Sequence, residues 1–213
     1  MALAPSTRRF LSLLALLGGA AALFVTRPRF TPALSERGTD ARTATCLSNL
    51  NQIARAYALY AHDFDGKIPR GIDPEDRNSK DSPFFNPANP TPYLHEILRP
   101  YVASRQVFHC PADVGWTQNR LPNSQGSLED VHPSSFSKFG TSYYCWTIFG
   151  FAQVGAVDLE FPQETILLFD GDLWHGERPG DRLNALFADG HVQNLSPRQF
   201  QVGSATPDFS SIN

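Results

Sequence analysis

An apolar segment near the start of the chain sets the strongest limit on how this sequence can fold. Residues Phe10 to Thr26, FLSLLALLGGAAALFVT, contain no charged side chain, and arginines flank both ends of the segment. As a helix it is about 25 Å long, slightly less than the roughly 30 Å of a bilayer core, and arginine side chains can extend to the interface. Two predictions remain open: a retained membrane anchor, which we favour, and a secretory signal cleaved after Ala20-Ala21-Ala22.

Both predictions divide the chain at the same place. Residues 1–32 form an anchor or signal segment, and residues 33–213 form one domain outside the cytoplasm, either periplasmic or at the cell surface. The formal net charge is −3, and no run of Lys or Arg follows the first thirty positions, so nucleic acid is not an expected partner. Seventeen prolines and fifteen glycines predict a fold with long irregular loops.

The first regular element of this domain is an amphipathic helix over residues 41–64. Apolar side chains recur there at helical spacing, which predicts one buried face. These side chains are Cys46, Leu50, Ile53, Tyr57, Tyr60 and Phe64. Gly66 is expected to end the helix.

The rest of the domain changes from a helical to a strand-like pattern. Residues 70–92 predict an extended surface loop, and a short helix should follow with Thr91 as its cap and Pro92 in its first position. After a second irregular stretch, 111–139, short β-prone runs are separated by turn residues. These runs are TSYYCWTIF (141–149), ETILLFD (164–170), LNALFAD (183–189) and HVQNL (191–195). One long helix followed by a small antiparallel sheet is an α+β fold.

The order of short motifs resembles a family. TCLSNLNQIARAYALYAHDFDGKIP, FHCPAD, TSYYCW, PQETILLFDG and LNALFADGHV follow one another as in the pseudopilin-like, prepilin-type proteins of bacteria, whose C-terminal domain is marked by a histidine, nine residues and Asp-Gly. The resemblance implies a membrane helix that continues into an amphipathic helix packed on an antiparallel sheet. It also implies a structural or assembly protein of a type II secretion or type IV pilin-like system, not an enzyme, with other pilin-like subunits or secretion components as partners.

Two positions depart from the family pattern. The prepilin signature, a Gly-Phe cleavage site followed shortly by Glu, has no counterpart in RRFLSLLALLGG. Ten residues before Asp189 the chain has Pro179 in place of histidine, and the nearest histidine is His175. The family marks at both ends of the protein are therefore incomplete.

Three cysteines bear on the redox state of an exported domain. None of them belongs to a CxxC motif, which disfavours zinc and thioredoxin-type chemistry. Cys46 lies on the buried stripe of the helix, and Cys110 lies in a loop after a short strand that can dock there. We therefore predict a Cys46–Cys110 disulfide, with Cys145 as the free thiol.

Acidic and imidazole side chains crowd together before the last strand. A metal site would need three or four of them to converge, but no HxH, HExxH or DxDxDG spacing supports one. These candidate ligands are Asp170, Asp172, His175, Asp189 and His191. The alternative, which we favour, is a solvated loop followed by a hairpin in which Asp189 and Gly190 are the two central turn residues between strands 183–188 and 191–195. No cofactor is predicted, and a structural Ca²⁺ ion remains an alternative.

Two other function classes compete with the assembly protein. One is an exported module that binds a glycan, a peptide or an ion, with Trp174, His175 and the adjacent acidic loop as its contact surface. The other, which we rank last, is a metal-dependent hydrolase that uses Asp170, Asp172, His175 and His191. The sequence contains no GxSxG elbow, and the neighbours His109 and Cys110 do not by themselves make a catalytic pair.

Overall fold

A computed structural model describes residues 33–122, 128–176 and 181–204. The chain divides into two compact units, Met1–Ser35 and Glu36–Asn213, and the second unit contains every strand described below. The apolar segment Phe10–Thr26 lies outside the described residues. None of the helices within the described ranges has the length and hydropathy that a bilayer crossing requires.

Helix α1 spans Ala33–Asp63 and presents one apolar face to the core. Cys46, Leu50 and Ile53 are fully buried at the spacing that the sequence predicts. Phe64 differs from the prediction, because it follows the helix and is 49% exposed. Gly66 adopts a left-handed φ of 78°, and its N–H donates to the carbonyl of Ala61, which caps the end of the helix as predicted.

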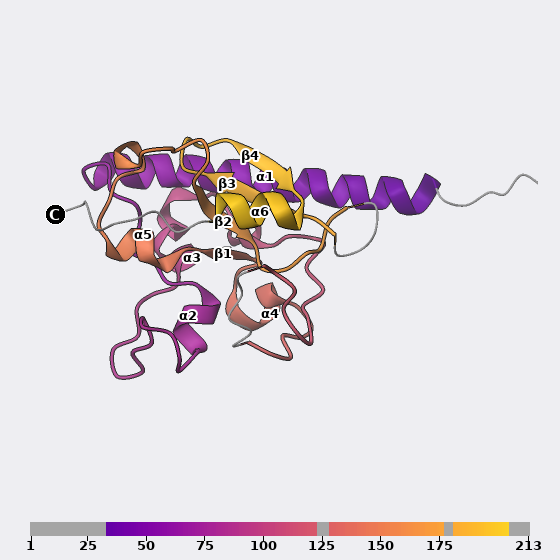
Figure 1. Cartoon of the computed structure of the whole chain (residues 1–213), viewed down its shortest axis with the longest axis horizontal. Helices are drawn as coiled ribbons and strands as arrows, with labels where there is room; N and C mark the ends of the chain where they lie inside the picture. Colours follow the sequence, from indigo (N-terminus) through magenta and orange to yellow (C-terminus); the bar gives the residue numbers. More distant parts are fainter. Residues whose placement is uncertain (1–32, 123–127, 177–180, 205–213) are drawn as a thin grey trace, which may run out of the picture. The chain divides into compact units, whose positions relative to one another are not determined.

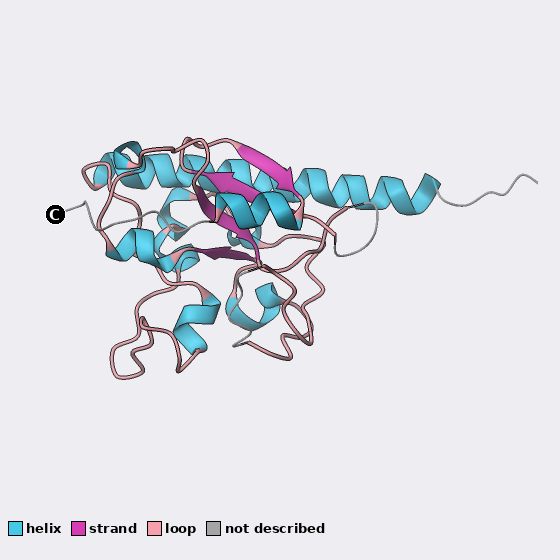
Figure 2. Cartoon of the chain, in the orientation of Figure 1, coloured by secondary structure: helices cyan, strands magenta, loops and turns pink. Residues whose placement is uncertain are grey.

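Four short strands form one antiparallel sheet. Its order is β1-β2-β3-β4, so each strand pairs with the next one along the chain. The strands are β1 (Tyr143–Cys145), β2 (Ile166–Asp170), β3 (Leu183–Phe187) and β4 (Val192–Leu195). A long helix with a small antiparallel sheet is the α+β fold class predicted from the sequence. Figure 2 shows the strands grouped beside α1 and surrounded by short helices and loops.

Helices cover the sheet, which explains why every residue of β2 and β3 is buried. Figure 1 shows α6, Pro197–Gly203, in front of the sheet and α1 behind it. Phe200 of α6 packs on Phe169 of β2, with ring centroids 4.9 Å apart. On α1, the Tyr143 hydroxyl of β1 donates to the Cys46 carbonyl at 3.4 Å. The core therefore lies on both faces of the sheet.

The expected strand over residues 141–149 is too long, and its second half is a helix. Strand β1 ends at Cys145, and α5 occupies Thr147–Phe151. Gly150 of α5 packs so closely on the backbone of Pro69 that an added Cβ would lie 2.4 Å from its carbonyl oxygen. Tertiary packing of this kind overrides the β propensity of an aromatic run.

The two stretches read as irregular loops also contain helices. Helix α2 (Pro74–Asn78) lies within 70–92, and α4 (Ser135–Phe139) lies within 111–139. Helix α3 is shorter than expected, at Leu94–Ile97, and Tyr93 occupies its N-cap position instead of Thr91. The chain also forms 3₁₀ turns at Arg99–Tyr101, Arg105–Phe108 and Ala156–Asp158. Elements of three to five residues are too short to give a periodic signal in the sequence.

Candidate functional site

The end of β2 and the residues directly after it, 170–175, are buried and not solvated as the sequence suggested, whereas Asp181 is exposed. Asp170, Asp172 and His175 are 0% exposed, and Leu173 and Trp174 are each 7% exposed. The composition of this segment, rich in Gly and charged residues, is typical of a surface loop. The fold instead places residues 170–175 inside the domain, so each polar group there requires a partner.

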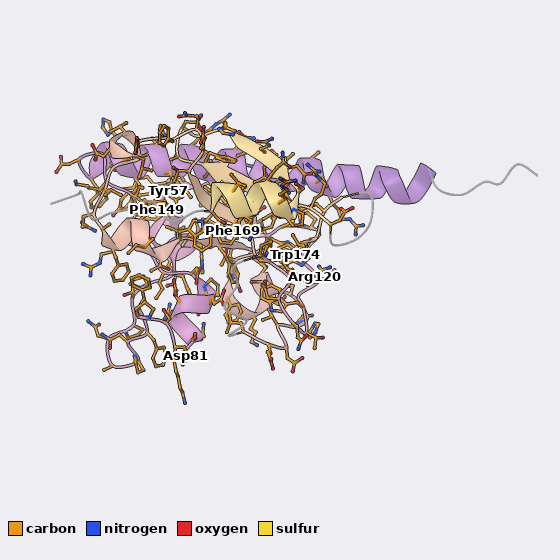
Figure 3. All side chains as sticks on the ribbon, viewed as in Figure 1. Tyr57, Asp81, Arg120, Phe149, Phe169 and Trp174 are labelled. Atoms are coloured by element: carbon orange, nitrogen blue, oxygen red, sulfur yellow. A yellow bond between two sulfur atoms is a disulfide. The ribbon has the colours of Figure 1, made fainter. Side chains whose placement is uncertain are left out.

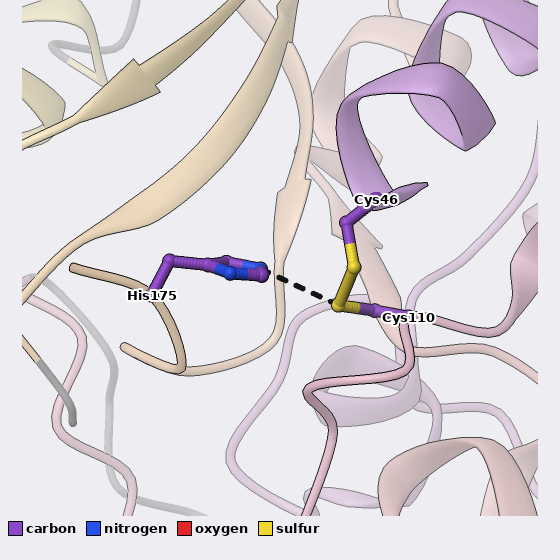
Figure 4. Close-up of side chains that lie close together, drawn as sticks. All are labelled: Cys46, Cys110 and His175. Carbon is purple, nitrogen blue, oxygen red and sulfur yellow. Dashed lines mark hydrogen bonds between the residues drawn. A yellow bond between two sulfur atoms is a disulfide. The ribbon is translucent and has the colours of Figure 1, made fainter. Parts of the chain in front are cut away.

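His175 lies at the centre of a buried polar cluster. Its Nε2 atom is 3.4 Å from the Sγ atom of Cys110 and 3.3 Å from the Oδ2 atom of Asp170. On the other side of the ring, Nδ1 is 2.9 Å from the hydroxyl oxygen of Thr43 on α1. Figure 4 shows the imidazole ring pointing at the sulfur of Cys110. A helix, a loop and the end of a strand thus meet at one side chain.

The structure joins Cys46 to Cys110 by a disulfide, the pair named from the sequence. The two Cα atoms are 5.0 Å apart, within the usual range for a disulfide, and 64 positions separate them along the chain. The N–H of Cys110 donates to the Ser142 hydroxyl next to β1. Cys145 is a free and fully buried thiol, and burial raises its pKa well above the ordinary value. A thiol of that kind is unreactive in the folded protein.

Asp170 has one satisfied and one unsatisfied oxygen. Its Oδ2 atom accepts a hydrogen bond of 2.5 Å from the N–H of Asn184 on β3. Its Oδ1 atom is buried and has no hydrogen-bond partner within the described part of the chain. Burying a carboxylate oxygen in this way is costly, so the atom marks a place where a bound ligand would be stabilising.

Asp172 accepts hydrogen bonds from Arg120, which lies in the long loop before α4. The Arg120 guanidinium donates to its Oδ2 through Nε and Nη2, at 3.1 and 3.0 Å, and the Arg120 backbone N–H donates to its Oδ1. The same guanidinium donates to the carbonyl of Leu173, the residue before Trp174, and Figure 3 labels Arg120 and Trp174. Asp172 therefore holds the loop to the sheet and is not free to ligate a metal or to act as a base in this conformation.

Asp189 and His191 lie at the opposite end of β3 and contact each other. Asp170 lies beside Asn184 near the start of that strand, whereas the turn follows Phe187 at its end. The Asp189 Oδ1 atom is 2.6 Å from the His191 Nδ1 atom and accepts the His191 N–H at 3.0 Å. The five candidate metal ligands therefore form three separate groups instead of one site.

The hairpin turn forms where the sequence predicts it but has a different geometry. The N–H of Gly190 donates to the carbonyl of Phe187, so Ala188 and Asp189 are the central residues, and Gly190 follows with a φ of 91°. Asp189 is not among the residues with positive φ. The prediction that Asp189 and Gly190 are the two central residues of a two-residue turn is therefore wrong. A type I turn followed by a left-handed glycine is the common three-residue alternative.

The carboxylate of Asp189 is stabilised at this turn. Desolvation raises its pKa, but the hydrogen bonds from the backbone and side chain of His191 and the charge of that imidazole together outweigh desolvation and lower the pKa overall. This arrangement needs only the oxygen atoms of Asp189. These contacts account for an aspartate at position 189 without a metal ion.

Replacing Gly190 with valine is expected to lower the free energy of unfolding by about 1 to 2 kcal/mol or more, because a β-branched residue is strained at positive φ. An added Cβ would meet no atom within 4 Å, so the strain comes from the backbone alone. Asp189→Asn should be nearly neutral, since its amide oxygen can still accept the His191 N–H. Melting temperatures of both variants, with and without a chelator, check this order. Chelator-sensitive protein destabilised mainly by Asp189→Asn would instead identify Asp189 as a metal ligand.

Trp174, considered as part of a contact surface for a glycan, a peptide or an ion, belongs to the core. Trp174 packs against Trp116 with ring centroids 6.1 Å apart, and both are at most 7% exposed. His175 beside it is fully buried. Neither Trp174 nor His175 therefore offers a contact surface to a glycan or peptide in this conformation.

One cavity of about 170 Å³ lies between the second half of α1 and the β3–β4 turn. Its wall is mostly apolar, with Ala54, Tyr57 and Ala58 of α1 on one side and Leu186 of β3 on the other. Lys67 and Asp189 are the charged residues among those that line it. The cavity is small for a metabolite, because pockets for small ligands usually measure 300 Å³ or more.

Several residues that organise this region had no signal in the sequence. Asp113 accepts four hydrogen bonds, Arg120 holds Asp172, and Thr43 and Asn184 contact His175 and Asp170. Each of these contacts joins parts of the chain that are far apart or buried by the fold. The one sequence feature close to them is the CPAD motif at residues 110–113, which places Asp113 three residues after Cys110.

Comparison with protein-family models, with curated proteins and with solved structures finds no match to this chain.

Proposed function

We propose that this protein is a membrane-anchored, pilin-like structural subunit that acts outside the cytoplasm by assembling with other proteins. The observation that carries the proposal is the 31-residue helix α1, which buries one face against an antiparallel sheet and is preceded in the sequence by the charge-free segment Phe10–Thr26. A helix placed between an apolar segment and a small α+β head is the arrangement that the resemblance to prepilin-type proteins implies.

A disulfide and a buried third thiol support the extracytoplasmic part of the proposal. Disulfides persist in oxidising compartments and are rare in the bacterial cytoplasm. The Cys46–Cys110 bond ties α1 to the loop that precedes β1, and Cys145 is too deeply buried to exchange with it. The domain is thus suited to an environment in which exposed thiols are oxidised.

The state of the ionisable side chains supports a role by interaction instead of catalysis. Asp172 is held by Arg120, and Asp189 is held by His191. His175 and Asp170, which lie close together, are both fully buried. General acid–base catalysis needs a side chain that reaches a substrate, so this arrangement favours a structural role.

The expected result for the anchor is that the full chain fractionates with membranes and keeps residues 10–26. Leu16→Arg should move a large part of the protein out of the membrane fraction, because arginine at the centre of a membrane helix costs about 2.5 to 3.5 kcal/mol. Leu16→Ile is the matched control and should leave fractionation unchanged. The measurements are fractionation and intact mass. Soluble protein with a new N-terminus near Leu23 would show that the segment is a cleaved signal.

Assembly is tested separately by crosslinking the anchored protein in its membrane and identifying the products by mass spectrometry. Adducts between copies of the chain, or to pilin-like or secretion components, are expected. Their loss in the Leu16→Arg variant would show that assembly depends on the anchor. An anchored protein that stays monomeric under conditions that crosslink a known oligomer would contradict the assembly role while leaving the anchor intact.

A further inference from the structure

We propose that, once the Cys46–Cys110 disulfide is reduced, Cys46, Cys110, His175 and Asp170 bind one divalent cation of the zinc class in a buried tetrahedral site. The disulfide form and the metal form would then be two alternative states of the same cluster. The proposal goes beyond the assembly role and does not depend on it.

The His175 Nε2 atom already lies at tetrahedral spacing from Cys110 Sγ and Asp170 Oδ2, whereas the two sulfur atoms are bonded to each other and would separate to about 3.8 Å after reduction. One ligand atom from each of Cys46, Cys110 and His175 lies within 4.8 Å of the other two, and this is the one such group found among the described residues. Asp170 is outside this group and adjoins it through His175, so its carboxylate would move closer to the sulfurs when the ion binds. With metal–ligand bonds of zinc length, tetrahedral edges are about 3.5 Å between sulfur and nitrogen and about 3.3 Å between nitrogen and oxygen. The observed distances from His175 Nε2 are 3.4 Å to Cys110 Sγ and 3.3 Å to Asp170 Oδ2.

Asp170 supplies the fourth ligand and the second observation that points to a cation. Its Oδ1 atom is fully buried and accepts no hydrogen bond within the described residues, while its Oδ2 atom faces the histidine. A buried carboxylate is stabilised when it coordinates a metal. With two thiolates and one carboxylate against a charge of +2, the site carries one net negative charge. The Asn184 N–H donates toward that charge.

Thr43 prepares the histidine for this role. Its hydroxyl oxygen lies 2.9 Å from Nδ1, so it can accept the Nδ1 proton and leave a lone pair on Nε2. Nε2 is the atom that faces Cys110 and Asp170. Metal-binding histidines usually have such a partner on the second ring nitrogen, and its loss costs about 10- to 100-fold in metal affinity.

The disulfide form and the metal form interconvert by reduction and oxidation of the two cysteines. A reductant, here a phosphine, supplies two electrons, two protons from water complete the two thiols, and the water oxygen leaves on the phosphine oxide. The metal ion then displaces one proton from each thiol and forms two metal–sulfur bonds. In the reverse direction the two metal-bound thiolates give two electrons to a small-molecule disulfide, which takes two protons from water and becomes two thiols. The sulfur–sulfur bond of the protein forms again, and the ion is released.

Both states join α1 to the loop before β1, whereas the reduced protein without metal lacks this connection. The cysteines lie 64 positions apart, and His175 lies 65 positions after Cys110. The ligands are therefore too far apart in the sequence to form a local zinc-binding motif. This explains why the spacing of the cysteines in the sequence argued against zinc.

The experiment uses the full chain in detergent, reduced with a phosphine and then titrated anaerobically with Co²⁺, followed by competition with Zn²⁺. We expect one ion per reduced chain, a thiolate charge-transfer band and the strong visible bands of tetrahedral Co²⁺. Oxidised protein should bind none. Thr43→Val keeps the shape of the side chain and should weaken binding by about tenfold or more. His175→Ala should weaken it further, and Asp170→Asn should change the visible spectrum.

Cys145→Ser and His191→Ala are matched controls, because they remove a thiol and an imidazole outside the cluster, and both should bind Co²⁺ as the unchanged protein does. Uptake by oxidised protein, or uptake that Thr43→Val, His175→Ala and Asp170→Asn all leave unchanged, would overturn the proposal. So would a reduced chain that binds no ion, or one that unfolds and does not refold when Zn²⁺ is added. If His175→Ala does not fold, the other two variants decide the result.

Discussion

Cys46→Ser combined with Cys110→Ser is expected to lower the free energy of unfolding by about 4 kcal/mol. The disulfide closes a loop of 64 residues, and in the chain-entropy model a loop of that length is worth about 4 kcal/mol. A loss of this size is a large part of the 5 to 15 kcal/mol that typically separates folded and unfolded domains. Urea unfolding in metal-free buffer, followed by tryptophan fluorescence, measures it.

Cys145→Ser is the control for this prediction, because it removes the third sulfur and leaves the disulfide in place. Its cost should be smaller, since it comes from burying a hydroxyl in a packed site and not from the loss of a crosslink. Peptide mapping without reductant would contradict the assignment if it found Cys145 in a disulfide. Equal stability of the double variant and the unchanged protein would show that the bond does not form.

Asp113→Ala is expected to lower the free energy of unfolding by about 3 to 5 kcal/mol. The carboxylate of Asp113 accepts N–H groups from Gly115, Ser135 and Phe136 and the Ser142 hydroxyl, at distances between 2.7 and 3.0 Å. Asp113 is only 8% exposed, so alanine would leave these donors without an acceptor inside the protein. A buried donor without a partner costs more than a missing contact at the surface.

Two further variants show whether the effect comes from the carboxylate. Asp113→Asn keeps the size of the side chain but turns an amide NH₂ toward donors, so it should recover only part of the loss. Glu129→Ala changes an exposed acidic residue near the same loop and should stay within about 0.5 kcal/mol of the unchanged protein. An Asp113→Ala variant as stable as Glu129→Ala would show that the four hydrogen bonds do not hold the loop.

Replacing Asp113 should also disturb the backbone next to the disulfide. Its Oδ2 atom accepts the Ser142 hydroxyl, and the Ser142 hydroxyl oxygen in turn accepts the Cys110 N–H at 3.0 Å. Losing the carboxylate would therefore loosen the backbone that holds Cys110. Residues in one hydrogen-bond network are not energetically independent, so the Asp113 and cysteine variants should combine non-additively.

The amino-acid pattern alone was enough to place the regular elements with strong periodicity. Cys46, Leu50 and Ile53 repeat at helical spacing, and they are the buried face of α1. The β-prone runs around Leu168, Ala185 and Asn194 became β2, β3 and β4, in an antiparallel sheet. Patterns of this kind are readable because each side chain faces the core or the solvent according to its position in its own helix or strand.

Apart from the two disulfide cysteines, only the tertiary structure decided which distant side chains meet. His175 reaches Cys110 across 65 positions, and Arg120 reaches Asp172 across 52. Burial also reversed the expectation for residues 170–175, whose polar side chains resemble those of a solvated loop. Periodicity reports the environment of a residue but carries no information about its partner. The helix, the strands and the choice of cysteines therefore follow from the sequence, whereas the cluster around His175 exists only because the folded chain brings α1, the Cys110 loop and the end of β2 to one place.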